Sequence, residues 1–112
     1  MKFKFFEQTQ INLSANRIAV VNGGAGGIGA AVVLRLTRDG FCVVILDKDE
    51  KAGREILAEL RDRGGKGDFF SIDLTKQYGV QRVFDIIISD LGRVDVLVNI
   101  AGGTLRHNWG QV

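Results

Sequence analysis

The chain has 112 residues, which is enough for one domain with a single core and leaves no room for a second. Apolar residues make up 46% and charged residues 25%, a globular composition that argues against a disordered chain or a coiled coil. The 15 basic and 13 acidic residues leave a net charge of +2 and form no basic stripe, so we expect no nucleic-acid partner.

Short apolar runs alternate with longer amphipathic ones, which is the pattern of β-α units around a parallel sheet. Residues 17–22 (RIAVVN) predict a first buried strand. A helix is expected over residues 26–39, with Gly40 as its C-terminal stop. Its apolar residues recur at helical spacing: Ile28, Val32 and Leu36.

The second β-α unit follows directly. Residues 41–46 predict a strand, and a helix begins near Asp49, whose side chain can cap free amides. Gly64 and Gly65 end this helix. The side chains expected to face inward are Ile56, Leu57 and Leu60.

The third unit is weaker at its start. Residues 68–72 predict a strand, and Thr75 can cap a helix that Gly92 closes. A fourth strand is expected over residues 94–99. The apolar residues of the helix recur at its spacing: Val80, Val83, Phe84, Ile87 and Leu91. The order β-α-β-α-β-α-β has no internal boundary, so we expect residues 1–112 to form one partial domain.

A glycine-rich segment lies between the first strand and the first helix, at residues 22–29 (NGGAGGIG). A pyrophosphate needs backbone N–H groups at the start of a helix, and β-carbons in the turn would hold it away. The loop fits two spacings, one with Gly24, Gly26 and Gly29 and one with Gly23, Gly27 and Gly29. A flexible turn is the alternative interpretation, but the position between strand and helix favours a dinucleotide-binding loop.

Asp47 ends the second strand, eighteen residues after Gly29. A carboxylate there would accept hydrogen bonds from both hydroxyls of an adenosine ribose and would repel a 2′-phosphate. The loop carries no basic residue, so NAD is favoured over NADP. Lys48, directly after Asp47, is a cation that could still allow some binding of NADP.

Four separated motifs resemble the short-chain dehydrogenase/reductase family. Residues 22–29 match its Thr-Gly-x-x-x-Gly-x-Gly, with Asn22 in place of threonine, where it can still brace the turn. Asp47 matches the acidic residue of NAD-preferring members. Asp73-Leu74 matches the pair that lies near the adenine, and residues 99–102 (NIAG) resemble the family's Asn-Asn-Ala-Gly. The resemblance implies these cofactor-binding residues: Gly23, Gly24, Gly26, Gly27, Ile28, Gly29, Asp47, Lys48, Asp73, Leu74, Asn99, Ala101 and Gly102.

The same resemblance implies an α/β fold of Rossmann type, a parallel sheet in the order 3-2-1-4 with helices on both faces, truncated after the fourth strand. It implies hydride transfer between a nicotinamide cofactor and an alcohol or carbonyl, performed by a serine, a tyrosine and a lysine that follow the point where this sequence stops. Tyr78 and Arg82 are one helical turn apart, like the family's tyrosine and lysine. Arginine stays protonated, however, so we interpret this pair as part of an exposed helix face. A non-catalytic dinucleotide-binding or interaction module is the alternative.

Location and assembly follow from what the chain lacks. It has no secretory signal and no run near the roughly eighteen apolar residues of a membrane span, so a cytoplasmic protein without a membrane partner is expected. Cys42 lies in an apolar run and is expected to pack as a small hydrophobe. No metal-ligand cluster is present in the sequence. The fourth strand would be an open edge, which favours homo-oligomers or other association.

Overall fold

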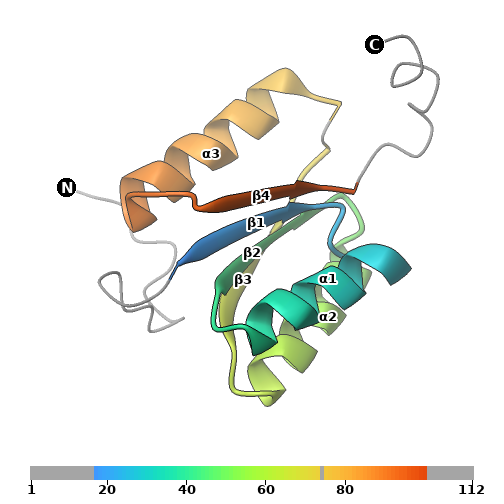
Figure 1. Cartoon of the computed structure of the whole chain (residues 1–112). Helices are drawn as coiled ribbons and strands as arrows, with labels where there is room; N and C mark the ends of the chain where they lie inside the picture. Colours follow the sequence, from blue (N-terminus) through green and yellow to red (C-terminus); the bar gives the residue numbers. More distant parts are fainter. Residues whose placement is uncertain (1–16, 74, 101–112) are drawn as a thin grey trace, which may run out of the picture.

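The computed structural model describes residues 17–73 and 75–100, and its centre is a four-stranded parallel sheet (Figure 1). The strands run in the order β3-β2-β1-β4, as predicted. The strand bounds are β1 Ile18–Asn22, β2 Cys42–Asp47, β3 Lys66–Ser71 and β4 Val96–Asn99. The helix bounds are α1 Gly27–Arg38, α2 Glu50–Asp62 and α3 Gln77–Leu91.

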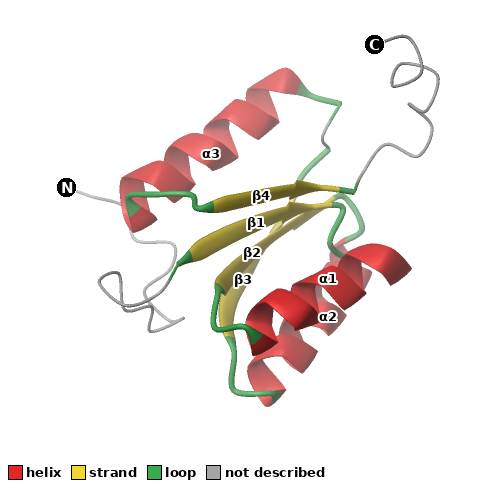
Figure 2. Cartoon of the chain, viewed as in Figure 1, coloured by secondary structure: helices red, strands yellow, loops and turns green. Residues whose placement is uncertain are grey.

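The helices cover both faces of the sheet (Figure 2). The chain adds β2 and then β3 outward from β1, and α1 and α2 pack together on one face. After β3 the chain returns to the other side of β1 to form β4, so the direction of strand addition reverses. Because β-α-β crossovers keep one hand, a reversal moves the connecting helix to the opposite face, where α3 lies.

Both central strands are buried on both faces, which explains their continuous apolar sequences. Alternate residues supply two separate clusters. The cluster under α3 contains Ile18, Val20, Cys42, Val44, Leu46, Ile72, Val83, Ile87 and Leu91. The cluster under α1 and α2 contains Val21, Val33, Val43, Ile45, Ile56, Leu57, Leu60 and Phe69.

The inward positions predicted for α2 and α3 are confirmed, and in α1 Val32 and Leu36 pack against the core while Ile28 does not. Val33 is the fully buried apolar residue of α1, Val32 and Leu36 are half-buried, and Ile28 is 75% exposed. Spacing alone defines a stripe and not its rotation, which here is set by the contact between the first turn and the preceding loop.

Helix caps follow the prediction in α2 and depart from it in α3. Asp49 caps α2 by accepting a hydrogen bond from the Ala52 amide at 3.0 Å. Thr75 does not cap α3, because that helix starts at Gln77 with Lys76 as its N-cap residue. The Thr75 amide and hydroxyl instead donate to the Asp73 carboxylate. Gly92 ends α3 in the left-handed conformation, at φ 81°.

Two strands begin two residues away from the predicted position, while the other strand boundaries agree within one residue. β3 begins at Lys66, two residues early, and includes Gly67, a residue type that strand propensity disfavours. A β-carbon at Gly67 would lie 2.1 Å from the Val43 carbonyl oxygen, so close pairing with β2 requires glycine there. β4 begins at Val96, two residues late. Asp95 still contacts β1, because its amide donates to the Ile18 carbonyl at 2.8 Å and its carboxylate accepts from the Ile18 amide at 2.7 Å.

Cys42 is buried within the sheet, as expected. Burial, with a smaller contribution from the charge of Asp68 that outweighs Lys66, raises the pKa of its thiol to about 12. In the part of the chain that the structure describes, no helix combines the length and the apolar character that crossing a membrane requires.

Candidate functional site

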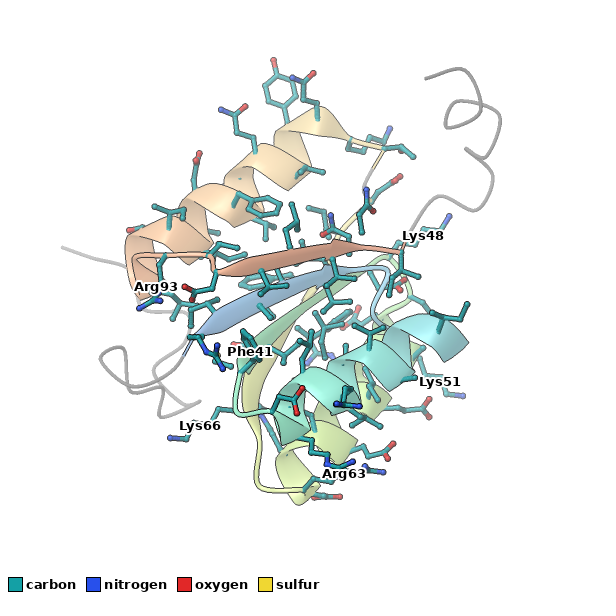
Figure 3. All side chains as sticks on the ribbon, in the orientation of Figure 1. Phe41, Lys48, Lys51, Arg63, Lys66 and Arg93 are labelled. Carbon is teal, nitrogen blue, oxygen red and sulfur yellow. The ribbon has the colours of Figure 1, made fainter. Side chains whose placement is uncertain are left out.

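The predicted site residues gather at the carboxyl edge of the sheet, where β1 and β4 are neighbours and the direction of strand addition reverses. In open α/β sheets this reversal leaves a crevice that ligands use. Figure 3 labels Lys48 at this edge, with Phe41 and Lys66 at the opposite one. The glycine loop, the end of β2 and the end of β4 therefore lie together.

The start of the loop is fastened to the sheet through its backbone. The Gly23 amide donates to the Leu46 carbonyl at 2.7 Å, and Gly23 has φ 80°, a conformation that favours glycine. A β-carbon on Gly29 would lie 2.0 Å from the Gly23 carbonyl oxygen. The first turn of α1 can therefore lie against the loop because residue 29 has no side chain.

The remaining loop glycines fall into two groups. A β-carbon on Gly24 would lie 2.9 Å from Ile45 Cγ2 and 3.1 Å from Val33 Cγ2, so Gly24 is packed against the core. Gly26 and Gly27 are exposed, and a β-carbon on either would meet no atom within 4 Å. The protein's own packing therefore does not require glycine at positions 26 and 27.

The N-terminus of α1 has no side-chain cap. Gly26, its N-cap residue, makes no side-chain cap bond, and the first turn contains no acidic residue. α2 differs, because Asp49 satisfies one of its amides and Glu50 lies in its first turn. The first-turn amides of α1 and the positive end of its dipole are thus left available to an anion.

Asp47 is the last residue of β2, and its carboxylate contacts the glycine loop. Oδ2 accepts from the Ala25 amide at 3.1 Å, and Oδ1 accepts from the Asp49 amide at 3.0 Å. The sequence prediction did not include Ala25, because its contribution is a backbone N–H that no sequence pattern marks. Lys48 is exposed, and its carbonyl lies 3.4 Å from the Ser71 hydroxyl that donates to it.

Asp73 follows β3 at the same edge, since the preceding amide, of Ile72, donates to the Asp47 carbonyl at 2.9 Å. Asp73 Oδ1 accepts from the Thr75 hydroxyl at 2.6 Å and from the Thr75 amide at 2.9 Å. These two bonds, the hydroxyl's first, lower the pKa of the Asp73 carboxyl. The neighbouring site prediction, Leu74, lies outside the described residues.

Asn22 and Asn99 are partners in register at the ends of β1 and β4. The Asn22 carbonyl accepts from the Ile100 amide at 2.9 Å, and this bond links the end of β1 to the residue after β4. Its side-chain Oδ1 is buried and finds no donor among the described residues, so the bracing bond expected from this atom is not observed. Asn99 is exposed. Ala101 and Gly102 lie outside the described residues.

Ile28 belongs to the first turn of α1, beside the open glycines, and is 75% exposed. Tyr78 is 90% exposed on α3, as expected for an outer helix face. Across residues 17–73 and 75–100, no three His, Cys, Asp or Glu side chains form a group that could hold a metal ion.

A family model and several curated proteins match this chain, and they agree on one family. A family model described as short chain dehydrogenase matches residues 17–111. A 3beta-hydroxysteroid dehydrogenase from Mediterraneibacter gnavus is 36% identical over 86 residues, which cover 77% of this chain and 31% of that protein. A cyclopentanol dehydrogenase from a Comamonas species is 36% identical over 87 residues, covering 78% and 35%. The chain therefore spans about a third of the length of these relatives.

Solved structures resemble the fold as well. NAD+-bound xylitol dehydrogenase matches with a TM-score of 0.69 and 30% identity, covering 72% of this chain and 31% of that one. An actinorhodin polyketide ketoreductase with NADPH matches with a TM-score of 0.76 and 30% identity, covering 83% and 35%. Their names contain two different cofactors, so the choice between NAD and NADP for this chain rests on its own residues.

Proposed function

The chain belongs to the short-chain dehydrogenase family, and we propose that it forms the adenosine-diphosphate half of an NAD site in an oxidoreductase. The observation that carries the proposal is the open space at Gly26 and Gly27. A β-carbon at either position would meet no atom of the described residues within 4 Å, and the N-cap residue of α1 makes no side-chain cap bond. A diphosphate fits such a place, because it needs close backbone approach and positive partial charge.

Asp47 supports NAD over NADP. Its carboxylate is fixed beside the loop, 3.1 Å from the Ala25 amide, where ribose hydroxyls can donate to it and a 2′-phosphate is repelled. Lys48 is exposed directly after it, and its positive charge can weaken this preference. We therefore expect NADP to bind more weakly than NAD.

The remaining contacts are assigned by their position at the same edge. Asp73 uses Oδ1 for Thr75, and Oδ2 would accept from the adenine amine. Gly23, Gly24 and Gly29 shape the loop from within. Five further residues complete the proposed set of cofactor contacts. They are the exposed apolar residue beside the loop and residues at or after the ends of β3 and β4: Ile28, Leu74, Asn99, Ala101 and Gly102.

The activity proposed for the whole protein is hydride transfer between the nicotinamide and an alcohol or carbonyl. The support is membership in a family whose curated relatives include a 3beta-hydroxysteroid dehydrogenase and a cyclopentanol dehydrogenase. A module that binds the dinucleotide without turnover is the second candidate.

Calorimetric titration of the purified chain with NAD, NADP and ADP-ribose tests the binding proposal. NAD and ADP-ribose should give similar heats, because the proposed contacts belong to the adenosine diphosphate, and NADP should bind more weakly. Lack of heat with all three ligands at millimolar concentration would contradict the proposal. Formation of NADH with simple secondary alcohols, measured on the whole protein, distinguishes an oxidoreductase from the second candidate, because the catalytic serine, tyrosine and lysine are expected beyond this sequence.

Association through the open sheet edge is also proposed. β4 pairs with β1 on one side and with no other described strand, and Leu97 on this strand is 55% exposed. An unpaired edge with an exposed apolar side chain favours pairing with another chain. Sedimentation velocity over a concentration series should reveal self-association that Leu97→Lys reduces, and concentration-independent monomers would refute it.

A further inference from the structure

The Asp47 carboxylate connects two segments that are separate in sequence. Oδ2 accepts from the Ala25 amide in the glycine loop, at 3.1 Å. Oδ1 accepts from the Asp49 amide in the turn before α2, at 3.0 Å. Both oxygens are therefore engaged by the protein without any ligand, which a residue serving only to contact a ribose would not require.

We propose that Asp47 is a positioning residue, which holds the glycine loop in its binding conformation before a nucleotide arrives. The inference rests on the proposed function, because the loop conformation matters only if the loop receives a diphosphate. Through the Ala25 amide, the carboxylate fixes the residue that directly precedes the open positions Gly26 and Gly27.

The loop needs such a restraint because of its composition. Its first part is fastened by the Gly23 and Gly24 amides, which lie 2.7 Å and 3.4 Å from the Leu46 carbonyl that accepts from both. Its far end enters α1, where the Ala30 amide donates to the Gly26 carbonyl. Ala25 lies between these anchors, with glycine on both sides. Glycine loses more conformational freedom on ordering than other residues, so a loop ordered in advance binds its ligand at lower entropic cost.

The positioning role and a ribose contact are compatible on one side chain. An ionised carboxylate offers about four acceptor positions, and the two amides use two of them. Two ribose hydroxyls can use the rest, so neither amide bond has to break when the nucleotide binds. Asparagine of the same shape keeps one acceptor oxygen and presents an NH₂ group to the other amide, so it can hold one of the two segments.

Backbone amide exchange of Ala25, measured by NMR on the ligand-free full chain, tests the proposal directly. The exchange rate should rise from wild type to Asp47→Asn to Asp47→Ala, by at least about tenfold in the alanine variant, since bonds to charged groups are the stronger ones. Asp62→Asn is the matched control, because it removes the same charge at the exposed C-terminal end of α2. Its Ala25 rate should equal that of wild type.

The same exchange experiment reports whether the variants fold, through the core amides of β1 and β2. An Ala25 rate in Asp47→Ala that equals wild type, with the core amides protected, would overturn the positioning role. A rise shared equally by the loop and the core amides would also overturn it, because the carboxylate would then support global stability and not the loop.

A ligand without ribose hydroxyls separates positioning from ribose contact. We expect 2′,3′-dideoxyadenosine diphosphate to bind Asp47→Ala at least about threefold more weakly than Asp47→Asn, because the two variants have equal charge and differ in one acceptor for the loop. Equal affinities would overturn the inference. If the wild type binds neither this probe nor ADP, the proposed function fails, while the Ala25 exchange rates still decide whether Asp47 positions the loop.

Discussion

Gly29→Ala should destabilise the protein although alanine is the better helix former. The new β-carbon would lie 2.0 Å from the Gly23 carbonyl oxygen and 2.9 Å from the Gly23 carbonyl carbon and Gly24 Cα. An unstrained carbon–oxygen contact is about 3.3 Å, so the loop and the helix must separate by about 1.3 Å. The obstacle is backbone on both sides, so no side-chain rotation can relieve it.

The size of the effect follows from two opposed contributions. Overpacking of this kind costs about 3 kcal/mol at the upper end of its usual range. Replacing glycine by alanine inside a helix returns about 1 kcal/mol. The net loss in the free energy of unfolding is therefore about 2 kcal/mol, which lowers Tm by about 10 °C in a domain of this size.

Gly27→Ala is the matched control, two residues away in the same helical turn. Its β-carbon meets no atom within 4 Å, so it should stabilise the protein by about 0.4–1 kcal/mol. Its effect on NAD affinity should be the opposite, because the methyl group enters the space proposed for the diphosphate. Urea denaturation and calorimetric titration measure the two properties separately. A Gly29→Ala variant as stable as wild type, or a destabilised Gly27→Ala variant, would refute this reasoning.

Three further outcomes are expected. Thr75→Val should raise the depressed pKa of Asp73 toward its ordinary value, because the threonine hydroxyl is the first cause of the depression. Because the pKa of Asp73 is lower in the folded chain than in the unfolded chain, its bonds to Thr75 stabilise the fold fully above the ordinary pKa of Asp. This stabilisation is lost as the pH falls through the folded-state pKa. A ¹³C titration of Asp73 that is identical in wild type and Thr75→Val would contradict this. Cys42, whose pKa is raised to about 12, should resist maleimide at pH 8 in the folded chain and react after unfolding in urea; rapid labelling of the native protein would show that the thiol is accessible. Asn22→Val should raise the free energy of unfolding by about 1 kcal/mol, since it removes a buried oxygen without a donor in the described structure; a lower denaturation midpoint would mean that Asn22 has a partner.

Strands and helices were predictable where their determinants are local. The apolar run of β2 and the inward residues of α2 follow from burial and from helical spacing, and Asp49 caps α2 as its residue type suggested. The sheet order came from the family resemblance. It agrees with the crossover rule once α3 is placed on the opposite face from α1 and α2.

Features that depend on contacts distant in sequence were not predictable. Gly67 enters β3 because the Val43 carbonyl of the neighbouring strand lies against it. Asp95, just before β4, has a carboxylate that accepts from the amide of Ile18, 77 positions away in sequence. In both cases the partner lies outside the local pattern.

The glycine loop shows why a motif needs a structure before its residues can be assigned roles. All five of its glycines match the family pattern or its alternative spacing equally well in sequence. In the structure, the protein's own packing or φ requires three of them: Gly23, Gly24 and Gly29. Gly26 and Gly27 meet no described atom that would require glycine, and at Gly27, in the first turn of α1, glycine costs stability relative to alanine. At Gly27 a residue type that costs stability and relieves no clash in the described structure is explained by a molecule that is not part of the chain. Gly27, together with the open space beside Gly26, and not the whole motif, therefore supports the proposed bound diphosphate.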